Sequence, residues 1–122
     1  MRSPHGEFPE YHTSADNLGF VKEASLEESL GLLREVVEVL ENDQVYLNTN
    51  PKCEPQLGKR GLYDSIVGSD DKKSKEMAMF WLLNLSDGRY SLLDVAERSG
   101  IPFTTIKEVA DLLARHELLQ LK

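Results

Sequence analysis

Residues 91–121 read SLLDVAERSGIPFTTIKEVADLLARHELLQL, and this stretch decides the fold of the C-terminal half. Ser91 and Asp94 have the spacing of a helix N-cap, which opens a short helix. The run 99–101 contains a glycine and predicts a tight turn, after which Pro102 starts a longer helix. The longer helix places these apolar residues on one face: Ile106, Val109, Ala110 and Leu113. An apolar, strand-like run then ends the chain.

Another predicted helix precedes this unit. Asp70 or Asp71 can cap it, and Asp87-Gly88 ends it. Its predicted apolar face consists of Met77, Phe80, Trp81 and Leu85. A short helix, a glycine-containing turn and a longer helix form a helix-turn-helix. With a helix before it and a strand after it, the segment 71–121 resembles a winged helix.

The predicted second helix of this motif is poorly suited to nucleic acid. Its outward positions are Phe103, Thr104, Lys107, Glu108 and Asp111. Of these only Lys107 suits a base or a phosphate, and residues 70–122 carry a net charge of −1. We therefore assign no DNA-binding residue and expect packing, dimerisation or partner binding. The alternative is a stand-alone winged-helix module that binds DNA or protein.

A long amphipathic helix is predicted over residues 25–42. Ser25 and Glu28 form a capping-box pattern at its start. Its apolar stripe contains Leu26, Leu30, Leu33, Val37 and Leu40, widened by Leu32, Val36 and Val39. Glutamates occupy the opposite face, which we interpret as solvated surface.

Between the two helical regions the pattern is mixed. Residues 44–48 predict a short strand, and residues 51–68, rich in proline and glycine, predict a long ordered loop or a linker. We expect two domains, 1–68 and 69–122. The predicted fold class is α+β, mainly α.

Length and composition limit the function classes. The chain has 122 residues, a formal net charge of −7 and one cysteine, Cys53, so neither a disulfide within the chain nor a thiolate metal cluster can form. The N-terminus lacks the apolar segment of a secretory signal, and the most apolar stretch, 77–85, is too short to span a bilayer. We expect a soluble, cytoplasmic protein without membrane contact.

Two of the three histidines, His5 and His12, lie in an irregular N-terminal segment among acidic residues. From the residues alone this is a weak metal signal. However, residues 9–17, PEYHTSADN, resemble the last metal-ligand motif of zinc aminopeptidases with two co-catalytic metals. With residues 2–18, residues 48–63 and the winged-helix tail, nearly the whole chain resembles the C-terminal part of aminopeptidase-like proteins associated with polysaccharide biosynthesis.

This resemblance implies that His12 is a zinc ligand and that Asp16 supports it as an outer carboxylate. It also implies two zinc ions that lower the pKa of a bridging water and polarise the scissile carbonyl. The other ligands and the general base lie upstream in that family and have no counterpart here. We therefore expect a fragment of a metallohydrolase, with no catalytic residue in this chain and no tight zinc binding by the chain alone.

The same resemblance makes residues 1–68 a remnant of an α/β catalytic domain. The 25–42 helix is then its last helix, with an apolar face shaped to cover a sheet. An apolar face of this size predicts a partner. We expect the remainder of the catalytic domain or a second copy of the chain, and hence a homo-oligomer.

Overall fold

The computed structural model describes residues 4–66 and 71–122. The chain divides into two compact units, Met1–Glu38 and Val39–Lys122. The predicted boundary at residues 68 and 69 falls inside the second unit, and residues 67–70 lie outside the described residues. Each unit is considered separately.

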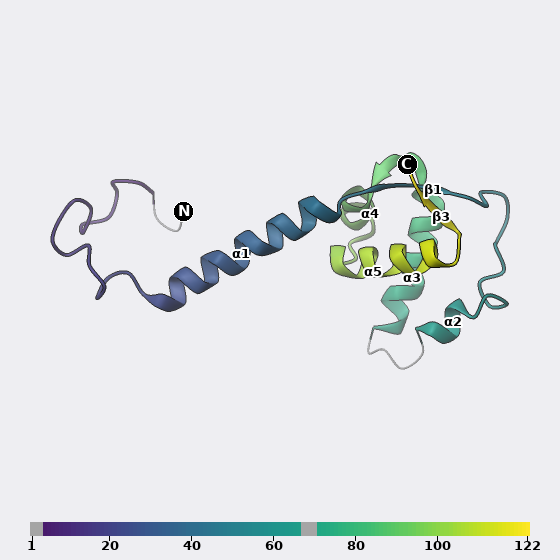
Figure 1. The fold of residues 1–122 in the computed structure, drawn as a ribbon, viewed down its shortest axis with the longest axis horizontal. Coiled ribbons are helices and arrows are strands. Elements are labelled where there is room, and N and C mark those ends of the chain that lie inside the picture. The colour runs from purple at the N-terminus through teal and green to yellow at the C-terminus, as the bar shows by residue number, and fades with distance from the viewer. Residues whose placement is uncertain (1–3, 67–70) are drawn as a thin grey trace. The chain divides into compact units, whose positions relative to one another are not determined.

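A helix-turn-helix forms the centre of the second unit (Figure 1). Helix α4, Leu92–Ser99, is capped by Ser91, whose hydroxyl accepts the Asp94 N–H at 3.3 Å while the Asp94 carboxylate accepts the Ser91 N–H at 2.8 Å. Gly100 follows with a φ of 68°, a left-handed conformation that glycine adopts without strain. Helix α5, Phe103–Arg115, then begins after Pro102. The predicted cap, turn and second helix are confirmed.

Three short antiparallel strands complete the winged helix. They are β1, Val45–Asn48, β2, Asp87–Ser91, and β3, Leu119–Leu121, and their order is β2-β1-β3. The central strand, β1, precedes the helices in sequence and pairs Leu47 with Asp87 on one side and Gln120 on the other. The sheet of this wing is thus completed by a strand from upstream of the helix-turn-helix.

The core of this unit combines the helices with the segment before them. Helix α3, Lys72–Leu85, packs against α5 and α4. The largest buried side chains are Leu57, Leu62, Met79, Leu82, Leu92, Ile106, Leu113, Leu118, Val95 and Val109. Leu57 and Leu62, the latter in the short helix α2, Leu62–Ser65, are fully buried. The sequence left two interpretations of this region, an ordered loop or a linker. The buried leucines show that residues 51–66 form an ordered loop.

The predicted apolar face of α3 is wrong in part. Its buried residues are Ala78, Met79 and Leu82, whereas Met77 and Phe80 are 44% and 41% exposed. Trp81 and Leu85 are partly buried against the core. Apolar residues cover a broad part of the surface of this helix. The side that packs against the core is rotated by about one residue from the face predicted from the largest side chains.

The first unit consists of an irregular leader and most of α1, Glu23–Asn42. The helix begins two residues earlier than predicted, so Ser25 lies within its first turns and is not its N-cap. The predicted end at Asn42 is confirmed. No residue of α1 is buried, and its apolar stripe is open, with Leu33 and Leu40 exposed by 62% and 69%. Among the described residues, no helix is long and apolar enough to cross a membrane.

Gly88 in β2 is expected to be intolerant of any side chain. Its φ is 82°, and a Cβ there would lie 2.9 Å from Leu47 Cδ2. We expect Gly88→Ala to lower the free energy of unfolding by about 1–3 kcal/mol, measured by urea denaturation of the chain. Gly31→Ala is the control, because Gly31 is helical with open space around it and should gain about 0.5–1 kcal/mol. Equal changes in stability for the two variants would contradict this account of Gly88.

Candidate functional site

The N-terminal histidine segment is a series of turns with an aromatic cluster. His5 Nε2 lies 2.7 Å from the Tyr11 hydroxyl, and the Tyr11 and His12 rings meet edge to face at 4.1 Å. His12 has a φ of 56°, in the left-handed region that is uncommon for residues with a side chain. The turn that contains it is closed by Thr13, whose hydroxyl donates to the Glu10 carbonyl at 2.8 Å. The Asp16 N–H closes the next turn on the Thr13 carbonyl at 3.2 Å.

This segment does not form a metal site by itself. Within residues 4–66 and 71–122, no three His, Cys, Asp or Glu side chains are grouped so that they could hold a metal ion. A catalytic zinc needs about three protein ligands. His12 and Asp16 therefore fit such a site only as part of a larger ligand set.

Two lysines of the winged helix, Lys107 on α5 and Lys75 on α3, are paired with carboxylates of α5. Lys107 Nζ lies 2.6 Å from Asp111 Oδ2 one turn along α5. Lys75 Nζ, on α3, lies 2.7 Å from Glu108 Oε1. The basic residue of α5 that best suits a phosphate thus already has an anionic neighbour.

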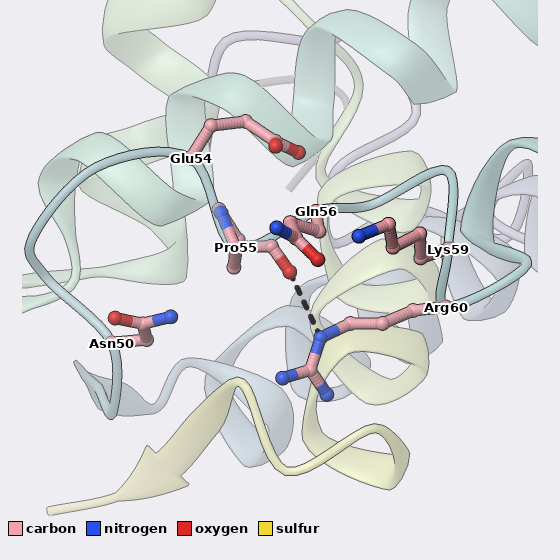
Figure 2. Close-up of a pocket in the computed structure, with 6 residues that line it drawn as sticks. All are labelled: Asn50, Glu54, Pro55, Gln56, Lys59 and Arg60. Carbon is pink, nitrogen blue, oxygen red and sulfur yellow. Dashed lines mark hydrogen bonds between the residues drawn. The ribbon is translucent and has the colours of Figure 1, made fainter.

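A polar pocket that the sequence did not predict lies in the ordered loop between β1 and α2. It has a volume of about 420 Å³ and is lined by Asn50, Glu54, Pro55, Gln56, Lys59 and Arg60. Figure 2 shows the Lys59 and Arg60 side chains extending toward the Pro55–Gln56 segment. In the sequence, the only sign of this pocket is the adjacent basic pair Lys59-Arg60. The residues around this pair are brought together by tertiary contacts, which the sequence does not reveal.

The pocket is anchored to the winged-helix core on several sides. Arg60 Nε donates to the Pro55 carbonyl at 2.9 Å, the contact dashed in Figure 2, and Arg60 Nη1 donates to the His116 carbonyl at 3.4 Å. The Glu54 carboxylate accepts the Leu57 N–H at 2.6 Å. Pro55 is buried, and Gln56 has a left-handed φ of 57°. The strained turn is held by these contacts.

Three side chains of the sheet have displaced pKa values, each with a structural cause, and one of them is Arg89, whose pKa is raised by its hydrogen bond to the Asp87 carboxylate. Burial raises the pKa of the Tyr46 phenol, whose hydroxyl donates to Gln44 Oε1 at 3.0 Å. The hydrogen bond from the Arg89 guanidinium lowers the pKa of the Asp87 carboxyl, a pair on the exposed edge of β2. None of these three groups lines the polar pocket or lies in the histidine segment.

Fold and sequence comparison agree on the class of this chain. The model of the winged helix-turn-helix family matches residues 44–121, which include all three strands and helices α2 to α5. The chain belongs to that family over this range. Residues 1–43 match the model of a domain of unknown function, DUF4910.

Two individual proteins are similar to nearly the whole chain. A Clostridium acetobutylicum protein provisionally named as a polysaccharide biosynthesis protein with an aminopeptidase-like domain is 54% identical over 121 residues. A crystal structure from the same organism, of a protein provisionally identified as a peptidase, matches 94% of the chain with 50% identity and a TM-score of 0.79. The chain spans 28% of the first relative and 24% of the second, and the match to the first is to its C-terminal part.

Proposed function

We propose that this chain is the C-terminal portion of an aminopeptidase-like zinc metallohydrolase that acts in polysaccharide biosynthesis. The observation that carries the proposal is the 54% identity, which extends over 99% of the chain to a relative named for an aminopeptidase-like domain. The match includes the histidine segment as well as the winged helix. At this identity over both units, a shared architecture is the simplest explanation.

In this proposal His12 holds zinc through one imidazole nitrogen, and Asp16 fixes the loop that presents it. The segment is suited to this, because Thr13 closes the turn that contains the histidine and Asp16 closes the next turn. Zinc in such a site would activate a water for hydrolysis. The remaining ligands and the general base would come from a catalytic domain outside these 122 residues. The substrate would be a peptide or an amide in a glycan precursor.

The open face of α1 supports the same proposal. A stripe of leucines and valines runs the length of the helix, and none of the residues of α1 is buried. Surfaces of this kind mark an interface. We propose that the catalytic domain covers this face, and that the protein is cytoplasmic and oligomeric.

The proposal predicts the size of the polypeptide that source cells produce. An antibody raised against residues 71–122 should detect, in source cells, a band several times larger than the 13.8 kDa of this chain. The physical reason is that one histidine cannot hold a catalytic zinc, so the remaining ligands must be supplied by more polypeptide. A single band at 13.8 kDa would contradict the proposal and leave the winged helix as the functional part.

For the winged helix, the charges favour a protein partner over DNA. Both Lys75 and Lys107 are in ion pairs, and their partners Glu108 and Asp111 lie on the helix that would enter the major groove. We expect a dissociation constant for duplex DNA no tighter than about 10⁻⁴ M at low salt, by fluorescence anisotropy. Lys107→Ala combined with Lys73→Ala should not change it. Tight, salt-sensitive binding that this double variant abolishes would establish the DNA-binding alternative.

A further inference from the structure

The polar pocket formed by Asn50, Glu54, Pro55, Gln56, Lys59 and Arg60 has the features of a ligand site that is independent of the proposed hydrolase centre. Its volume, about 420 Å³, lies in the range of small-molecule pockets. It is built entirely from the winged-helix unit. All the residues that line it therefore belong to this unit.

Arg60 is oriented before any ligand arrives. Two backbone carbonyls, those of Pro55 and His116, accept from Nε and Nη1. A guanidinium has five N–H donors in a rigid fork, so one donor on Nη1 and both on Nη2 are left for another acceptor. Because two of its nitrogens are bound to backbone carbonyls, the ligand would not have to order this side chain, which lowers the cost of binding.

The local charge differs in sign from that of the whole chain. The chain carries −7, but the pocket brings two cations, Lys59 and Arg60, together with one carboxylate. One oxygen of that carboxylate, on Glu54, already accepts the Leu57 N–H at 2.6 Å. Within the described part of the chain, Lys59 has no ion-pair partner. The pocket therefore has cationic donors available for an anion.

The other lining groups are suited to hydroxyls. Asn50 and Gln56 each carry a side-chain amide that can both donate and accept, and the second Glu54 oxygen can accept. Asn50 is held in place because its N–H donates to Asn48 Oδ1 at 2.9 Å. Asn48 in turn donates to the Leu83 carbonyl of α3 at 2.7 Å. The backbone of Asn50 is thus tied to the core through Asn48.

We propose that this pocket binds the oxyanion of a small hydroxylated molecule, such as a sugar phosphate or a sugar acid. Lys59 and the remaining guanidinium donors of Arg60 hold the phosphate or carboxylate, and the amides of Asn50 and Gln56 bind hydroxyls. Phosphate and carboxylate share the chemistry that these two cations recognise.

The test is titration of the ¹⁵N-labelled full chain, followed by NMR. The probes are glucose 6-phosphate, glucuronate, inorganic phosphate and glucose. We expect saturable shifts of amides in residues 50–61 with dissociation constants on the order of 1 mM for the sugar anions. Glucose should not bind, and inorganic phosphate should bind more weakly than glucose 6-phosphate. The stronger of the two sugar anions identifies the source of the oxyanion.

Lys59→Gln should weaken sugar-anion binding about tenfold, the effect of losing one charge-assisted hydrogen bond. Lys52→Gln is the matched control, because Lys52 is an exposed lysine of the same loop that does not line the pocket. It should leave binding unchanged. Equal weakening by both variants, equal binding of glucose, or the absence of saturable shifts with every anion would each overturn the proposal. An unchanged amide spectrum of free Lys59→Gln confirms that the variant is folded.

Discussion

Leu57→Ala should lower the free energy of unfolding of the chain by about 2–5 kcal/mol, although Leu57 lies outside every helix and strand. Its side chain is fully buried, and its backbone is fixed at both polar groups. The N–H donates to the Glu54 carboxylate at 2.6 Å, and the carbonyl accepts the Leu62 N–H at 3.1 Å. Truncation would leave a cavity that so constrained a loop cannot collapse to fill.

The matched control is Leu33→Ala. Leu33 lies on the open face of α1, with 62% of its surface exposed, so the same truncation should change stability by no more than about 0.5 kcal/mol. Urea denaturation followed by tryptophan fluorescence reports on the winged-helix core, because Trp81 packs against it. Similar, small effects of the two variants would show that residues 51–66 are a linker after all.

The sequence predicted the helix-turn-helix almost completely because its signals are local. Ser91 and Asp94 cap α4 through contacts three residues apart, and Gly100 supplies the left-handed residue of the turn. Such features depend on neighbours in the chain and need no knowledge of the rest of the fold. The start of α5 after Pro102 and the terminal strand were predicted from local signals in the same way.

The sheet and the core loop depend on distant partners. Strand β1 is four residues long, and its place in the centre is set by pairing with β2 and β3, which lie some forty and seventy residues downstream. No local pattern reveals this. The buried Leu57 and Leu62 stand among prolines and glycines that are typical of a linker, and only the tertiary structure shows that they complete the core.

The two candidate sites also differ in whether they depend on local sequence or on contacts between distant residues. His12 was identified by resemblance of its surrounding motif, and the structure adds the turn that presents it. The polar pocket was not predicted, because Arg60 is positioned by the carbonyl of His116, a residue 56 positions away. A charged pair in a loop becomes a candidate site only when such contacts are known.

The second large effect concerns His12 in the full-length protein. We expect His12→Ala to remove bound zinc and the hydrolytic activity that depends on it, because each protein ligand of a co-catalytic pair is required to hold its metal. Asp16→Asn should weaken zinc by about 10–100-fold, as expected of an outer carboxylate. His5→Ala is the control, since His5 lies in the same segment and contacts Tyr11 at 2.7 Å.

Zinc content per polypeptide, measured by mass spectrometry of the full-length protein and its His12→Ala and His5→Ala variants, tests the central claim most directly. We predict about two zinc ions in the wild type and in His5→Ala, and about one or none in His12→Ala. The isolated 122-residue chain should retain little zinc. Wild-type zinc content in His12→Ala, or tight stoichiometric zinc in the isolated chain, would contradict the assignment of this chain to a zinc hydrolase.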